Sequence, residues 1–258
     1  MLFIGVVSHA HSRFAISQGP QGLAAGLADQ LTDVTVKVNT ADLHDATALP
    51  VDARLIQQSL SAQLRLEDQW VAYLRGGRPR GLREVGASAL RHGLRWLRRL
   101  RPPGAGPVTR LINIELSHVD LMHAGLSSGA PWVLILEDDA FTADLGDCAT
   151  GLRDLLAETP ESVGYLSVSQ SFSNARLGIE HLLSPTPIPW RGSAPRALLS
   201  ASRPVTNTVC AVLYRRWFLG ELLAELDSMP MTPVVPIDFK VNAALMRMHA
   251  SASERRSP

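Results

Sequence analysis

The chain has 258 residues, enough for one large α/β domain or two small ones, and its hydrophobic content of 46% is ordinary for a globular protein. This composition argues against disorder, and the lack of any run of about 18 apolar residues argues against a transmembrane helix. The formal net charge of +1 conceals an uneven distribution. Nine arginines and one acid lie between Arg75 and Arg101, which gives +8 there and leaves −7 for the remainder. Such a block bears on partners rather than on fold.

Apolar runs and helical periods alternate along the chain. Leu2–Val7 is apolar throughout and leads into the loop Ser8–Arg13, as a buried parallel strand does; it is too short for a signal peptide and lacks a basic lead-in. In chain order we expect strand 2–7, helix 23–31, strand 34–38, helices 53–74, 82–100 and 110–126, strand 132–136, helix 145–157, strands 163–168 and 208–214, and helices 217–226 and 238–248. Residues 170–203 are rich in Ser, Pro and Gly and show no clear period, so we expect a long loop there.

This order of elements determines the expected fold class. No repeat and no linker divides the chain, and strands that alternate with helices predict a single α/β domain with a mainly parallel central sheet flanked by helices. We expect this domain to span residues 1–250, with an Arg-rich helical insert at about 75–103 and a disordered tail at 251–258. Cys148 and Cys210 have no metal-ligand spacing and are expected to be unpaired thiols of a cytoplasmic protein.

An apolar strand that runs into three acids is the most informative feature. Val133–Leu136 is apolar on both faces, as a central covered strand is, and Glu137, Asp138 and Asp139 follow it. Side chains alternate along a strand, so Glu137 and Asp139 are expected on one side, at the carboxyl end of the sheet where α/β folds bind ligands. Hard cations such as Mg²⁺ and Mn²⁺ bind such oxygens and neutralise a leaving diphosphate. The alternative is that Asp138 or Asp139 caps the next helix.

Two further blocks accompany this strand. Upstream, a helix carries Glu115-Leu-Ser117-His118; downstream, the small-residue strand Thr208–Tyr214 and a helix lead to Pro236-Ile-Asp238. In this order the blocks resemble the glycosyltransferases of the GT-A architecture, most closely the family-25 enzymes that extend lipopolysaccharide and collagen glycans. The resemblance covers about residues 108–245. The first loop matches the arginine-bearing loop of that family only loosely, and the Arg-rich insert has no counterpart in it.

The resemblance implies a GT-A (Rossmann-like) fold and a metal-dependent transfer of a hexose. The donor would be a nucleotide diphosphate sugar, expected to be UDP-linked, and the acceptor a hydroxyl of a bacterial glycan or glycolipid. The implied cofactor is Mn²⁺ or Mg²⁺, held by Asp139 and Glu137, while Asp138 would assist through the nucleotide or a ligating water. Asp238 would take the acceptor's hydroxyl proton in an inverting displacement, and the alternative for Asp238 is an N-cap.

Further residues are candidates for binding the donor. His9 and Arg13 follow the first strand, where GT-A enzymes place the nucleobase and the diphosphate, and Thr206 and Asn207 precede a later strand. Each has a plain structural alternative, namely an exposed loop, ordinary turn residues or, for His118 on an apolar helix face, a hydrogen-bonded core histidine. The expected donor-binding residues are His9, Arg13, Asn113, His118, Glu137, Asp138, Thr206 and Asn207.

The segment Leu82–Arg101 predicts a basic amphipathic helix with Trp96 near its end. Such helices lie on anionic membrane surfaces. The alternative is an exterior helix that packs its leucines on the core and leaves its arginines solvated. Nucleic acid is not an expected partner, because no stacking platform or recognition motif accompanies the charge. The protein is expected to be cytoplasmic. If the basic helix binds a membrane, the protein would also attach peripherally to the inner face of the plasma membrane.

Two other functions remain open at this point. His9-Ala-His11 after the first strand resembles the metal ligands of some barrel hydrolases, although a barrel needs about eight strands and five are expected here. A non-catalytic adaptor at a membrane surface would use the basic helix, and it would require Glu137, Asp138 and Asp139 to act only as caps.

Overall fold

The structure is a computed structural model of the chain. It describes residues 1–8, 12, 17, 22–40, 53–76, 81–100, 105–140, 144–169, 174, 179–186, 198–203, 208–229 and 235–254. Several expected donor-binding residues, namely His9, Arg13, Thr206 and Asn207, lie outside the described residues, as does His11 of the hydrolase motif.

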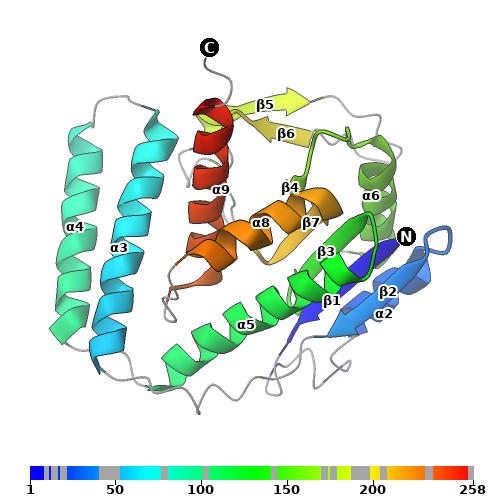
Figure 1. The fold of residues 1–258 in the computed structure, drawn as a ribbon, viewed down its shortest axis with the longest axis horizontal. Helices are drawn as coiled ribbons and strands as arrows, with labels where there is room; N and C mark the ends of the chain where they lie inside the picture. Colours follow the sequence, from blue (N-terminus) through cyan, green and yellow to red (C-terminus); the bar gives the residue numbers. More distant parts are fainter. Residues whose placement is uncertain are drawn as a thin grey trace.

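A five-stranded sheet forms the centre of the molecule, with the strand order β2-β1-β3-β7-β4 (Figure 1). The strands are β1 (Leu2–Val7), β2 (Val36–Thr40), β3 (Trp132–Glu137), β4 (Tyr165–Ser167) and β7 (Ala211–Arg215). β1 pairs in parallel with β2 and β3, while β7 runs antiparallel to both β3 and β4. Four strands therefore share one direction, which confirms the expected mainly parallel α/β sheet and is compatible with a Rossmann-like fold.

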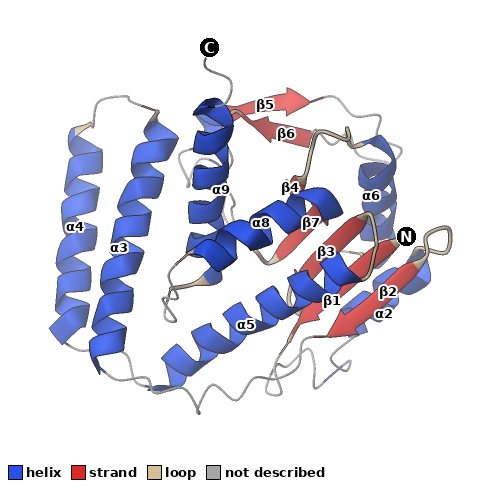
Figure 2. Cartoon of the chain, viewed as in Figure 1, coloured by secondary structure: helices blue, strands red, loops and turns tan. Residues whose placement is uncertain are grey.

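Helices cover both faces of this sheet (Figure 2). α5 (Ala105–Ser127), α8 (Arg216–Ser228) and α9 (Ile237–Glu254) pack on one face, and α2 (Gly22–Gln30) and α6 (Leu145–Glu158) pack on the other. The two-residue period of β3 explains this arrangement: Val133 and Ile135 pack with Leu121 of α5, while Leu134 and Leu136 pack with Leu27 of α2. β3 is therefore apolar on both faces because both are covered.

Two glycines bring α5 unusually close to the sheet. A Cβ added at Gly125 of α5 would lie 2.5 Å from Val133 Cγ1 of β3, and one at Gly5 of β1 would lie 3.2 Å from Leu121 Cβ of α5. Only a residue without a side chain fits such a separation. This close packing fixes the height of α5 above β1 and β3, and with it the position of His118 beside the end of β3.

The long helices α3 (Ala53–Arg75) and α4 (Leu82–Leu100) lie beside the central sheet and the helices that cover it, at the left of Figure 1. α3 packs against α9, and α4 packs against α3. None of the described helices is both long and apolar enough to cross a bilayer.

The structure differs from the sequence-based expectation in two places. The segment 170–203, expected as a loop, contains the short helix η2 (Glu180–Leu182) and the strands β5 (Leu183–Thr186) and β6 (Leu198–Ala201), which pair antiparallel as a separate two-stranded sheet. Helix α9 continues to Glu254, beyond the expected start of the tail at residue 251. The other expected helices and strands are present, although their ends differ by a few residues.

Candidate functional site

A cavity of about 410 Å³ opens at the carboxyl end of β3, where the antiparallel strand β7 begins. β3 ends at Glu137, and the amide of Ala140 donates to the Glu137 carbonyl (3.0 Å) to close a turn that carries the other two acids. The cavity is lined by Glu137, Asp139, Ala140, Ser169, Thr208, Cys210 and Asp238. Its volume is within the range of small-molecule sites. Three carboxylates from two distant parts of the chain therefore meet at one cavity.

The predicted pair of acids forms part of a potential metal site. One donor atom each of Glu137, Asp139 and Cys210 lies within 4.8 Å of the other two. Cys210 was missed from the sequence because it is far from the acids along the chain; it is brought there by the antiparallel pairing of β7 with β3, in which the Glu137 amide donates to the Cys210 carbonyl (2.7 Å). Burial raises the pKa of the Cys210 thiol to about 12, and the charges of Glu137, Asp139 and Asp238 add to this effect.

Asp138 points away from this cluster. Its Oδ2 accepts a hydrogen bond from Ser8 Oγ at the end of β1 (2.5 Å), and its amide donates to the Val7 carbonyl (3.0 Å). The capping alternative for Asp138 and Asp139 is wrong, because α6 is capped by Asp144, whose Oδ1 accepts from the Gly146 amide at 2.7 Å and the Asp147 amide at 3.2 Å. The acids at the end of β3 therefore have no role in starting the next helix.

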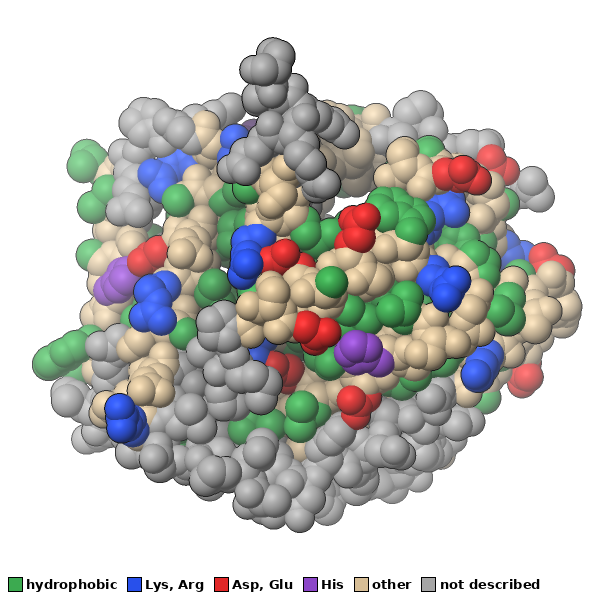
Figure 3. Space-filling model, in the orientation of Figure 1, with side chains coloured by type: hydrophobic (Ala, Val, Ile, Leu, Met, Phe, Trp, Pro, Cys, Tyr) green, Lys and Arg blue, Asp and Glu red, His purple; other side chains and the backbone are tan. Residues whose placement is uncertain are grey.

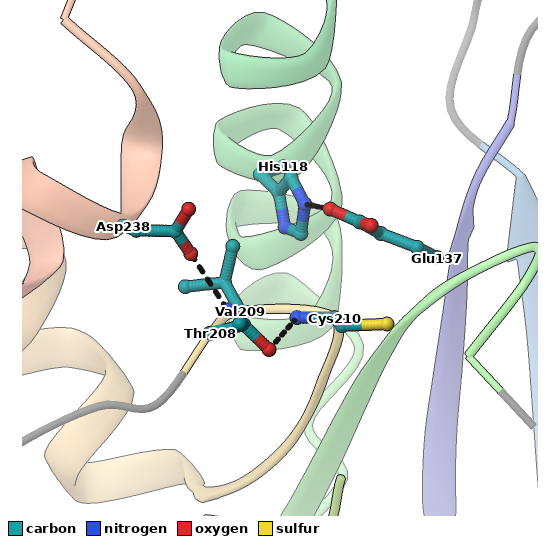
Figure 4. A network of polar contacts seen from close by, with 6 residues as sticks. All are labelled: His118, Glu137, Thr208, Val209, Cys210 and Asp238. Carbon is teal, nitrogen blue, oxygen red and sulfur yellow. Dashed lines mark hydrogen bonds and ion pairs between the residues drawn. The ribbon is translucent and has the colours of Figure 1, made fainter. Parts of the chain in front are cut away.

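His118 lies behind Glu137. It is fully buried on α5, and its Nε2 is 3.3 Å from Glu137 Oε1 (Figure 4). Nδ1 of His118 has no hydrogen-bond partner among the described residues. With Nε2 as the donor, the imidazole holds one oxygen of Glu137 in place. His118 is thus placed to position Glu137 and does not itself line the cavity. Asn113, further back on the same helix, does not line it either.

Asp238 faces the cavity from the first turn of α9. Its Oδ1 accepts a hydrogen bond from the Val209 amide (2.8 Å), just before β7 (Figure 4). Residue 238 is the second residue of α9, so it is not the N-cap of that helix. Burial raises the pKa of Asp238; the Val209 amide opposes this shift, the charge of Glu137 adds to it, and His118 opposes it. A carboxylate with a raised pKa at a cavity wall is suited to accept a proton.

Comparisons of the chain with protein-family models, curated proteins and solved structures find no match. The chemistry of the cavity itself therefore carries the functional argument.

A buried ion pair joins the two helices that supply His118 and Asp238. Lys240 Nζ of α9 donates to Glu115 Oε1 of α5, and both side chains are largely buried. Burial raises the pKa of Glu115, and Lys240 opposes the shift through its charge and its hydrogen bond. The sequence singled out Glu115 but not its partner. The pair fixes α9 against α5 close to the cavity.

Proposed function

We propose that this protein is a metal-dependent glycosyltransferase of the GT-A architecture that moves a hexose from a nucleotide diphosphate sugar, expected to be UDP-linked, to a hydroxyl of a glycan or glycolipid. The observation that carries the proposal is the meeting of Glu137, Asp139 and Asp238 at one cavity on the carboxyl edge of the mainly parallel sheet. Ligands of open α/β sheets bind at this edge.

The residues at the cavity fit a divalent cation. Glu137 and Asp139 supply the carboxylate oxygens that Mn²⁺ and Mg²⁺ prefer, and a site with two such ligands leaves positions for phosphate oxygens and water. The bound ion would neutralise the negative charge that develops on the departing diphosphate. Cys210 is a softer ligand beside the two acids, and it is the feature of this donor set least typical of a magnesium site.

The side chains divide the remaining work of transfer. The acceptor oxygen forms a bond to the anomeric carbon while the bond from that carbon to the diphosphate oxygen breaks. Asp238 is assigned to take the proton of the attacking hydroxyl, because it is the cavity carboxylate outside the potential metal cluster and its pKa is raised. Inversion at the anomeric carbon is the outcome that the family resemblance implies. His118 keeps Glu137 oriented through its Nε2.

The two alternatives have less support. A barrel hydrolase would need a closed sheet of about eight strands, whereas the described sheet is open, with β2 and β4 at its edges. An adaptor would use the three acids only as caps, whereas Asp144 caps α6 and Glu137 and Asp139 line a cavity.

The test combines ligand binding with a matched pair of variants. Thermal unfolding is followed with UDP, GDP and other nucleotides, each with and without Mn²⁺, and donor hydrolysis is then screened over a panel of nucleotide sugars. A transferase is stabilised by a nucleotide only when the metal is present; a hydrolase responds to metal alone, and an adaptor to neither.

Asp139→Asn is the decisive variant, and Asp144→Asn is its control. Asn caps a helix as well as Asp does, so the control should keep both stability and activity. Asp139→Asn should lose the metal-dependent stabilisation by nucleotide and reduce transfer by at least about a hundredfold. Full transfer activity in Asp139→Asn with the correct donor would refute the proposal.

A further inference from the structure

Helix α4 exposes large hydrophobic side chains from Leu82 to Leu97. Leu82, Leu90 and Trp96 expose 92%, 64% and 59% of their surface, and Val85, Leu94 and Leu97 are also exposed. Hydrophobic side chains stand out along the left edge of the space-filling view, where α4 lies in Figure 1 (Figure 3). The alternative in which these leucines pack on the core is therefore wrong.

These side chains share one face of the helix. At about 100° per residue, the exposed apolar residues from Val85 to Leu97 occupy about half of the circumference. The same period places the positions of Arg91, Arg95 and Arg98 on the opposite side. The helix is thus divided into an apolar half and a basic half, and it belongs to the segment with the excess of +8 in a chain of net charge +1.

The contact of α4 with the rest of the protein leaves this face open. α4 packs against α3, where His92 Nε2 lies 2.9 Å from Asp68 Oδ2. Gly86 and Gly93 lie within the apolar arc, and a Cβ added at either would meet none of the described residues within 4 Å. A broad exposed apolar face of this kind marks an interaction surface.

We propose that the apolar face of α4 binds the surface of a bilayer that contains anionic lipids. An interfacial helix combines Leu and Trp on one face with Arg on the other, as this helix does. The helix is only about 10 Å thick, so its arginines remain within about one Debye length of the headgroups when the apolar face enters the membrane. This inference does not depend on the reaction at the cavity.

A second copy of the chain fits this face less well. A two-stranded helical seam needs a narrow stripe of about two positions in seven, whereas the apolar arc of α4 is about twice that wide. Pairing two α4 helices would also bring together two segments of excess positive charge, each with a single acid to compensate it. The surface of an anionic bilayer is flat enough to cover the wide apolar arc of α4, and its negative headgroups complement the positive charge of the helix.

The test measures flotation of the full chain with vesicles of phosphatidylcholine alone and of phosphatidylcholine with phosphatidylglycerol. Leu94→Gln is compared with Leu199→Gln, a matched change of an exposed leucine on β6; the two wild-type residues expose 52% and 45% of their surface. A double variant, Arg95→Gln with Arg98→Gln, tests whether the positive charge of α4 contributes to the binding of anionic vesicles. Thermal unfolding of each variant shows whether the fold is kept, and light scattering gives the oligomeric state.

Wild type and Leu199→Gln should float with the anionic vesicles, and far less with neutral ones. Leu94→Gln should weaken this binding by roughly tenfold, because one leucine no longer enters the membrane. The double arginine variant should bind the anionic vesicles more weakly than wild type at low salt, and this difference should shrink as salt is added, because salt screens the attraction that the two arginines supply. No flotation with anionic vesicles, equal flotation with neutral vesicles, or equal loss in Leu199→Gln would overturn the proposal. A dimer that Leu94→Gln dissociates would instead assign the face to a second copy.

Discussion

Removing one member of the buried Glu115–Lys240 pair should destabilise the protein far more than removing both. The two side chains are 14% and 10% exposed, so Lys240→Met leaves the Glu115 carboxylate buried without its partner. Breaking a buried pair in this way costs about 3–5 kcal/mol at neutral pH. Glu115→Gln combined with Lys240→Met removes both charges and should cost less than about 2 kcal/mol, since the desolvation of the charges is no longer required.

The cost of Lys240→Met should also depend on pH. Burial raises the pKa of Glu115 above its ordinary value of 4.5, and Lys240 opposes this, so the pKa rises further in the variant. A carboxyl whose pKa is raised by folding stabilises the folded state at acid pH, and this stabilisation is lost as the pH rises through the folded-state pKa. Lys240→Met should therefore cost least near pH 4.5 and most at neutral pH.

Urea unfolding of the wild type, the single and the double variants at pH 4.5 and 7.5 measures these effects. Arg247→Met is the control on the same helix: Arg247 makes an ion pair with Glu225 (2.5 Å), but it is more than half exposed, so the cost should stay below about 1 kcal/mol. The reasoning is refuted if Lys240→Met costs no more than Arg247→Met, or if its cost does not fall on acidification.

Three other substitutions test the cavity and the packing that supports it. Asp238→Asn keeps an oxygen that accepts from the Val209 amide, but the new side chain does not titrate, so the melting temperature of the variant minus that of wild type, in metal-free buffer, should increase from pH 4.5 to pH 7.5. Transfer activity should fall by roughly 10²–10⁴-fold. A melting-temperature difference that stays constant with pH would contradict the raised pKa of Asp238. Cys210→Ser should weaken Zn²⁺ binding by at least roughly tenfold and leave Mn²⁺ binding nearly unchanged, as measured by calorimetry, and equal effects on both ions would show that the sulfur is not a ligand. Gly125→Ala should lower the free energy of unfolding, measured by chemical denaturation, by about 1–3 kcal/mol, because the new Cβ would lie 2.5 Å from Val133 Cγ1. Gly220→Ala is the control: the closest contact of its Cβ would be at 3.7 Å, so this change should be neutral or stabilising.

Local patterns were sufficient to predict most of the elements and the faces of the central strand β3. Val133 and Ile135 face one layer of helices and Leu134 and Leu136 the other, as the two-residue alternation requires. The same alternation predicted that Glu137 and Asp139 lie together, and they do, but a turn after Glu137, not a continued strand, carries Asp139. The helical period of α4 was equally clear. The β5–β6 pair was missed because its strands are short and one contains a proline, which weakens any periodic signal.

Contacts between distant segments could not be predicted in this way. The sequence by itself determined an apolar strand that ends in acids, an α/β order of elements and a basic amphipathic helix. Only the tertiary structure brought Cys210 and Asp238 to Glu137, paired Lys240 with Glu115, and left the leucines of α4 exposed. The physical reason is that periodicity fixes the faces of one element, whereas the partner of each face depends on how every other element packs.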